Sequence, residues 1–194
     1  DIKSGLKPSP SDKESIGKLV DKYLKHIQGA GKQPSTIIRY KTSLTAFTDY
    51  FSSEKSIGKV TYAVIENFKS YRLKTCSSSG VNVDLRHLRG FLNHCVRMGV
   101  ISESPYRGVK QVKVGEHIVR FLREAEIHSL LFEVHTGQDD DIMDLIQFYL
   151  HTGARANEIL PPNFTWESVK KDYIELYGKG EKTRRIGMND TMRK

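Results

Sequence analysis

The chain has 194 residues, enough to bury a sizeable core in one large domain or two small ones. Its 31 Lys and Arg against 23 Asp and Glu give a formal charge of +8, which indicates a polyanionic partner without separating nucleic acid from a membrane surface. Two cysteines are too few for a disulfide framework, their spacing fits no metal site, and no apolar stretch is long enough to span a bilayer. We therefore expect a reduced, cytoplasmic protein.

The first half of the chain has the pattern of a helical domain. Residues 1–12, rich in Lys, Ser and Pro, predict a loose tail or linker. Apolar side chains then recur every three or four residues through four segments, and Ser35 is the expected N-cap of the second. The sequence predicts amphipathic helices at about 13–28, 35–51, 61–74 and 81–97.

Two of these helices carry a polar stripe beside the apolar one. Arg and Asn on such a stripe can donate to base edges and phosphates in a major groove, whereas a solvated helix face is the alternative. Residues 1–115 hold 20 Lys and Arg against 9 Asp and Glu, while residues 116–194 hold 11 against 14, so the basic surplus favours DNA contact by the first half. The candidate DNA-binding residues are Thr36, Arg39, Ser43, Asn82, Arg86, Arg89, Asn93 and Arg97.

The periodicity is lost after Pro105, and a second set of elements follows it. We predict a helical domain at 13–112, a linker at 113–120 and a second domain at 121–194. In this domain we expect one helix after Arg123, another that opens at the acidic cluster 139–141 and stops at Gly153, and a β-hairpin with its turn at 178–182. Because carboxylates stabilise a helix N-terminus, the cluster of Asp139, Asp140, Asp141 and Asp144 is explained without a metal ion.

The most informative run is His151-Thr152-Gly153-Ala154-Arg155-Ala156-Asn157-Glu158-Ile159-Leu160, which Tyr177-Gly178-Lys179-Gly180-Glu181-Lys182-Thr183-Arg184 follows. Arg155 is expected at a helix start, beside N–H groups that favour an anion, and Lys179 at a hairpin tip. An arginine offers phosphate a two-pronged donor, and a lysine offers a mobile proton. The alternatives are an Arg155 paired with Glu158, a solvated Lys179, and Lys182 in the role of Lys179.

Both runs resemble the tyrosine recombinase (phage integrase) family, whose first active-site box reads Thr-Gly-x-Arg-x-x-Glu-Leu and whose catalytic lysine lies in a Gly-Lys-Gly hairpin. The segment 104–110, Ser-Pro-Tyr-Arg-Gly-Val-Lys, is similar to the end of the family's core-binding domain, and 121–127 to the start of its catalytic domain. The resemblance implies a mainly α fold: a four-helix SAM-like core-binding domain followed by a truncated α+β integrase catalytic domain with a small β-hairpin.

The resemblance also implies a function. The full-length protein would be a site-specific recombinase that cuts and rejoins duplex DNA through a 3′-phosphotyrosine intermediate, without a cofactor or metal, as a tetramer on its recombination site in the nucleoid. Arg155 would bind a non-bridging phosphate oxygen, Lys179 would protonate the departing 5′-oxygen, and Glu158 would support them.

The sequence departs from the family pattern in several places. Pro161-Pro162-Asn163 is an apparent insertion before Phe164-Thr165-Trp166, and Gly187 stands where the last strand of the family often has a proline. The family's second active-site box reads His-x-x-Arg and follows the lysine hairpin. Two strings that mimic it, around His87 and at 117–120, precede Arg155, and we assign them to helix surface and linker. The second arginine, the histidines and the nucleophilic tyrosine are expected beyond Lys194, so we expect an inactive fragment. The alternatives are a non-catalytic integrase-like accessory or regulatory protein and a topoisomerase IB-like relaxase.

Overall fold

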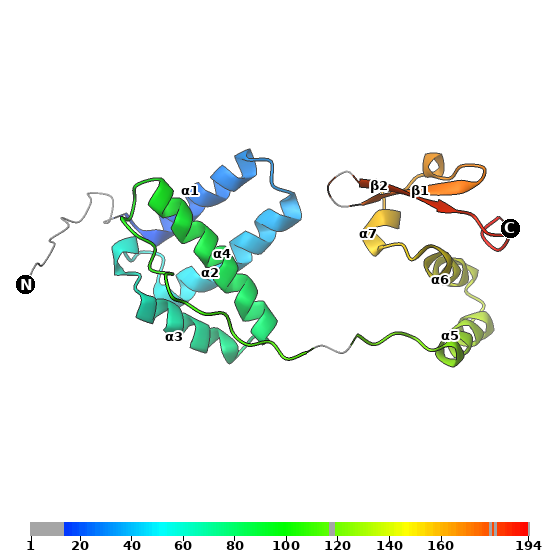
Figure 1. Cartoon of the computed structure of the whole chain (residues 1–194), viewed down its shortest axis with the longest axis horizontal. Coiled ribbons are helices and arrows are strands. Elements are labelled where there is room, and N and C mark those ends of the chain that lie inside the picture. The colour runs from blue at the N-terminus through cyan, green and yellow to red at the C-terminus, as the bar shows by residue number, and fades with distance from the viewer. Residues whose placement is uncertain (1–13, 117–118, 179, 181, 194) are drawn as a thin grey trace, which may run out of the picture. The chain divides into compact units, whose positions relative to one another are not determined.

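The computed structural model describes residues 14–116, 119–178, 180 and 182–193, and the predicted tail lies outside them. The described residues form seven α-helices, two short 3-10 helices and one two-stranded sheet, as the mainly α prediction requires (Figure 1). The chain divides into two compact units, residues 1–117 and 118–194, and each is described by itself.

Unit 1 contains the four predicted helices: α1 (Ile16–Gly29), α2 (Pro34–Phe51), α3 (Tyr62–Leu73) and α4 (Ser78–Arg97), with a 3-10 turn, η2 (Ile57–Lys59), between α2 and α3. The predicted cap of α2 is wrong, because Gln33 is the N-cap and Pro34 occupies the first turn, where a missing N–H is harmless. The hydroxyl of Thr61 accepts from the Val64 N–H at 3.3 Å and caps α3, and Ser77 caps α4 in the same way.

Helix α4 is the centre of unit 1, since it packs against α1, α2 and α3 (Figure 1). The apolar stripe of α4 is fully buried, and it forms one hydrophobic core with the large buried side chains of the other helices. Aromatic rings fill much of the remaining space, with Phe47 of α2 packed edge-on against Phe68 of α3 at 5.0 Å between centroids. The most buried core residues of unit 1 are Ile16, Leu44, Phe47, Ile57, Ile65, Phe68, Val81, Leu85, Leu88, Phe91 and Leu92.

The chain after α4 folds back onto unit 1 as far as Val112. The side-chain amide of Asn82 donates to the carbonyl of Val112 and accepts from its N–H, both at 2.8 Å, and the ammonium of Lys69 donates to the carbonyl of Lys110 at 3.2 Å. Tyr106, earlier in the same segment, is also buried. This returning segment is therefore part of unit 1.

Among the described residues, we expect trypsin to cut the chain first between Lys113 and Arg123. The described residues 113–116 and 119–122 make no backbone hydrogen bond to other described residues, so they should open for cleavage more readily than residues in the helices. Mass spectrometry of a brief digest checks the position. Earlier cleavage inside α2 or α4 would contradict the proposed division of the chain at 113–120.

Unit 2 begins with α5 (Glu124–Thr136) and α6 (Asp140–Thr152), and continues through α7 (Ala156–Ile159) and a 3-10 turn, η3 (Trp166–Ser168). The predicted hairpin follows as β1 (Tyr173–Gly178) and β2 (Lys182–Gly187), antiparallel with Tyr173 opposite Gly187 and Gly178 opposite Lys182. Asp139 caps α6, accepting from the Ile142 N–H at 3.1 Å.

The apolar faces of α5 and α6 are only partly covered by the rest of unit 2. Helix α5 buries no side chain and α6 buries only Thr152. The buried apolar side chains of unit 2 are Ile174 and Leu176 of β1. The best packed part of unit 2 is therefore the hairpin and the chain that lies against it, around α7.

Candidate active site and nucleic-acid interface

A tight turn at the end of α6 places Arg155. Gly153 has φ of +56°, a conformation that glycine adopts without strain, and its N–H donates to the carbonyl of Tyr149 at 2.9 Å. The hydroxyl of Thr152 donates to the carbonyl of Phe148 at 2.6 Å and accepts from the Ala154 N–H at 3.1 Å. Thr152 and Gly153 thus end α6, and only three residues separate it from α7, which begins at Ala156.

Arg155 is the N-cap of α7, and its charge is paired. Its N–H donates to Oε2 of Glu158 at 2.8 Å, and its Nη1 donates to Oε1 at 2.9 Å. Glu158 therefore occupies the backbone N–H at the start of α7, where an external anion was expected to bind. This matches the alternative interpretation, in which Arg155 pairs with Glu158. The Glu158 side chain is only 4% exposed, whereas that of Arg155 is 79% exposed. A buried carboxylate therefore holds a guanidinium that solvent and ligands can still reach.

A second arginine, which the sequence analysis missed, completes this cluster. Nη2 of Arg184 donates to Oε2 of Glu158 at 2.7 Å and to the carbonyl of Gly153 at 3.0 Å. Arg184 lies opposite the buried Leu176 in the hairpin, and Ile186 lies opposite the buried Ile174. The period of two along β2 was the signal that could have placed Arg184 on the inner face.

The turn of the hairpin starts beside the same carboxylate. A Cβ on Gly178 would lie 3.2 Å from Oε1 of Glu158, which is tighter than ordinary contact, so the backbone approaches Glu158 as closely as a glycine permits. Lys179, the next residue, lies outside the described residues. Its rival Lys182 is exposed and pairs with Gly178 at the start of β2.

The three donors on Glu158 stabilise its charged form. They lower the pKa of this carboxyl group from 4.5 to about 2, with the backbone N–H of Arg155 as the largest cause and the side chains of Arg184 and Arg155 adding to it. Glu158 is therefore a carboxylate at any pH near neutrality and cannot serve as a proton donor there. Its contacts suit it to holding arginines in place.

We expect unit 2 to lose stability as the pH falls from about 4.5 to 2. The unfolded chain takes up the Glu158 proton near 4.5, whereas the folded chain takes it up near 2, so the stabilisation is complete above the first value and is lost toward the second. Urea unfolding of the hairpin, followed by NMR peak intensities, should show this decline. Glu158→Gln should remove this part of the pH dependence, and an unchanged profile would contradict the assignment.

The basic residues predicted on α2 and α4 are all exposed. Arg39 lies on α2, while Arg86, Arg89 and Arg97 lie on α4; we call these four residues the basic face. His87 joins the two helices, since it stacks on Tyr40 of α2 at 4.1 Å between centroids. Burial lowers the pKa of His87; the charge of Asp84 opposes this shift, and the charges of Arg86 and Arg39 add to it.

Two of the predicted DNA-binding residues are held inside unit 1. Ser43 is buried, with its hydroxyl 2.8 Å from Nδ1 of His87, and Asn82 is buried with both ends of its amide on the backbone of Val112. The returning segment covers the start of α4, which periodicity alone could not reveal. Thr36 and Asn93 are half-buried, so the exposed basic face consists of arginines.

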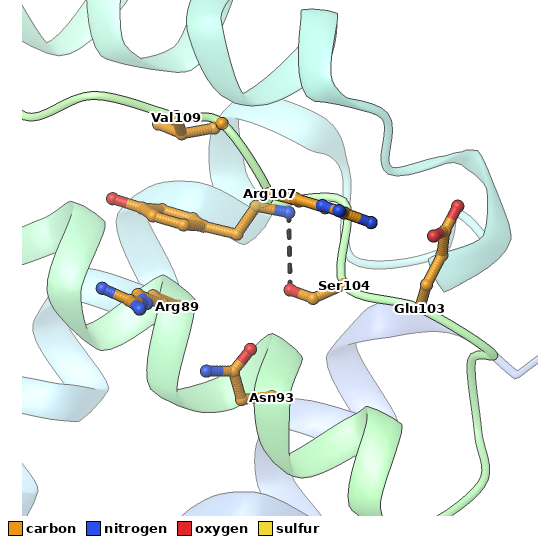
Figure 2. Close-up of a pocket in the computed structure, with 8 residues that line it drawn as sticks. Arg89, Asn93, Glu103, Ser104, Arg107 and Val109 are labelled. Atoms are coloured by element: carbon orange, nitrogen blue, oxygen red, sulfur yellow. Dashed lines mark hydrogen bonds between the residues drawn. The ribbon is translucent and has the colours of Figure 1, made fainter.

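A groove of about 450 Å³ continues the basic face between α4 and the segment 103–109. Figure 2 shows Arg89 and Asn93 on its α4 side and Arg107 on the other, with the carboxylate of Glu103 at one end. Arg89 lies over the ring of Tyr106, 5.9 Å from its centroid, and the hydroxyl of Ser104 accepts from the Tyr106 N–H at 3.4 Å. Arg107 is a further exposed cation that the sequence analysis did not select.

The strings that mimic a second active-site box have other contacts. His87 belongs to the joint between α2 and α4, and Arg120 pairs with Glu126 at 3.1 Å, while His117 lies outside the described residues. Over the described ranges, no group of three or more His, Cys, Asp or Glu side chains could hold a metal ion. None of the described helices is long and apolar enough to cross a membrane.

Comparison with known proteins identifies relatives of this chain. The family model of the phage integrase SAM-like domain matches residues 15–114. Tyrosine recombinase XerD of Shewanella oneidensis is 24% identical over 178 residues, 89% of this chain and 59% of the relative, and XerC of Thermodesulfovibrio yellowstonii is 28% identical over 171 residues, 85% and 56%. The chain thus spans about three fifths of the length of these relatives.

The fold is also shared with solved integrases. A lambda integrase tetramer bound to a Holliday junction superposes with a TM-score of 0.80 at 14% identity, over 97% of this chain and 58% of that one. The Tn1549 transposon integrase, in complex with a circular intermediate DNA, gives 0.71 at 16% identity over 92% and 62%. The first unit is therefore a phage integrase SAM-like domain. The chain belongs to the tyrosine recombinase family.

Proposed function

We propose that this chain supplies the DNA-binding face and part of the active site of a site-specific recombinase, which cuts and rejoins duplex DNA through a 3′-phosphotyrosine intermediate. The observation that carries the proposal is the exposed guanidinium of Arg155 held by the buried carboxylate of Glu158. A guanidinium fixed in this way can bind a non-bridging oxygen of the scissile phosphate and offset the charge that develops in the transition state.

Lys179 is the proposed general acid of the same reaction. It follows Gly178, whose backbone lies against Glu158, so the turn that carries the lysine starts beside the carboxylate that holds Arg155. An ammonium group there could protonate the 5′-oxygen as it leaves the phosphorus. Lys182 remains the rival for this role, because it is exposed at the other end of the turn.

Unit 1 would bind duplex DNA through the basic face. Four exposed arginines on two adjoining helices provide donors for phosphates and for guanine edges in a major groove. Arg107 and the groove beside Arg89 would extend this surface. The tetramer in which lambda integrase binds a Holliday junction supports the proposal that the full-length protein acts as a tetramer on its site.

We expect the chain to bind duplex DNA with an affinity that falls steeply as salt rises, since most of the binding would come from phosphate contacts. Replacing Arg86 and Arg89 with alanine should lower the slope of log K against log salt by about 1.8, at about 0.9 for each lost phosphate contact. Fluorescence anisotropy of a labelled duplex at several salt concentrations measures both values.

The matched control is Lys18→Ala with Lys25→Ala, two exposed lysines of α1 whose loss changes the net charge equally. If the control weakened binding as much as the arginine pair, only net charge would matter and the basic face would be wrong. Binding that does not depend on salt would contradict DNA binding through phosphates.

A further inference from the structure

The contacts of Arg184 tie three segments of unit 2 together. Its Nη2 reaches the carbonyl of Gly153 in the turn after α6, and Oε2 of Glu158 in α7, while its own backbone is part of β2. Oε2 of Glu158 thus accepts from the Arg155 N–H and from Arg184, and Oε1 accepts from the Arg155 guanidinium. Arg184 is the partner that fixes this carboxylate from the side of the hairpin.

The geometry of Glu158 depends on that partner. The last torsion of a glutamate side chain has a broad, shallow preference, so the direction of its two oxygens is set by the donors around them. The two donors from Arg155 lie within the same short helix segment, whereas Arg184 comes from a paired strand whose register is fixed along its whole length. Without Arg184 the carboxylate can turn, and the exposed Arg155 guanidinium turns with it.

The net charge of the cluster around Glu158 also depends on Arg184. Arg155, Arg184 and Glu158 together carry a net charge of +1, because two guanidiniums share one carboxylate. If Arg155 and Glu158 were alone, their charges would cancel and a phosphate would gain little from approaching Arg155. Arg184 is paired with Oε2, the other oxygen of the same buried carboxylate, and leaves Arg155 with a positive potential toward solvent.

We propose that Arg184 is a positioning residue of the recombination reaction: through Glu158 it orients Arg155 toward the scissile phosphate and keeps the cluster positive. This inference rests on the proposed function, since it assigns Arg184 to the reaction of Arg155. It touches no substrate in the proposed mechanism. The neighbouring Arg185 provides a comparison, because its exposed side chain lies on the other face of β2 and pairs with its strand partner Glu175 at 3.0 Å.

The test uses the full-length protein and a nicked suicide duplex, on which a single cleavage step is followed. Arg184→Ala should lower the rate constant of cleavage on the order of 100-fold, as expected for a misplaced reactive group, with DNA affinity changed far less. Arg184→Lys should restore much of the rate, because one ammonium can donate to both Gly153 and Glu158 and keeps the charge. Arg185→Ala should cleave like the unaltered protein.

A second readout needs only the present chain. The guanidinium N–H signals of Arg155 in nitrogen-15 NMR should be sharpened by its bond to Glu158, broaden in Arg184→Ala and stay sharp in Arg185→Ala. Unchanged cleavage and unchanged Arg155 signals in Arg184→Ala would overturn the inference. So would a loss of cleavage matched by an equal loss of hairpin protection in hydrogen exchange, since the role would then be structural. Failure of the unaltered protein to cleave would instead contradict the proposed function.

Discussion

Arg155→Ala in the full-length protein should nearly abolish DNA cleavage while leaving DNA binding by unit 1 intact. The loss expected for one donor to a charged transition state is about 100- to 1000-fold in the rate constant. Arg155 is the exposed member of the cluster around Glu158, so its removal opens no cavity in the core. Single-turnover cleavage of a suicide duplex measures the loss, and anisotropy on the same duplex measures affinity.

Lys179→Ala should fail for a different reason, and a modified substrate can separate the two defects. If Lys179 protonates the departing 5′-oxygen, a 5′-bridging phosphorothiolate should restore cleavage, because sulfur leaves without protonation. The same substrate should not restore Arg155→Ala, since charge on the non-bridging oxygens would stay unstabilised. Rescue of Lys182→Ala but not of Lys179→Ala would move the role to Lys182.

The second large effect concerns stability. Glu158→Ala removes the acceptor of three hydrogen bonds and leaves two guanidiniums facing each other, so we expect the hairpin of unit 2 to lose about 2 kcal/mol of opening free energy. Arg155 and Arg184 are partly exposed, which keeps the loss below that of a fully buried pair. Hydrogen exchange of the β1 and β2 amides measures it.

Glu175→Ala is the control for this prediction. It also removes a glutamate that pairs with an arginine of β2, but the Arg185 side chain is exposed and the pair lies on the outer face of the hairpin. We expect less than about 1 kcal/mol from its loss. Equal effects of the two substitutions would show that Glu158 has no special place in unit 2.

The helices of unit 1 could be predicted from the sequence because their apolar spacing is regular and their core is self-contained. Helix α4 illustrates this, with Val81, Leu85, Leu88 and Leu92 all buried where the period places them. The fate of Asn82 could not be predicted in this way, since the segment that covers it comes 30 residues later in the chain. Helical spacing identifies a polar face and leaves open what covers it.

In unit 2 the turn chemistry was more informative than periodicity. The Thr152-Gly153 turn, Arg155 and Glu158 lie together as their spacing suggested, and the hairpin pairs where β-like runs predicted it. Arg184 was missed because a charged residue on a strand is expected to face solvent, and only the register against Leu176 shows its direction. The apolar faces of α5 and α6 bury almost no side chain, so a periodic apolar pattern predicts a helix but does not show which element packs against it.

The most direct test of the account is to look for a covalent link between the full-length protein and DNA. The protein is mixed with a nicked suicide duplex, denatured, and examined by gel electrophoresis and peptide mass spectrometry. We predict an adduct through a tyrosine and the 3′-phosphate, formed without added metal or nucleotide and far more slowly in Arg155→Ala. DNA that is bound but never linked to the protein, or an adduct that forms equally fast in Arg155→Ala, would contradict the proposed mechanism.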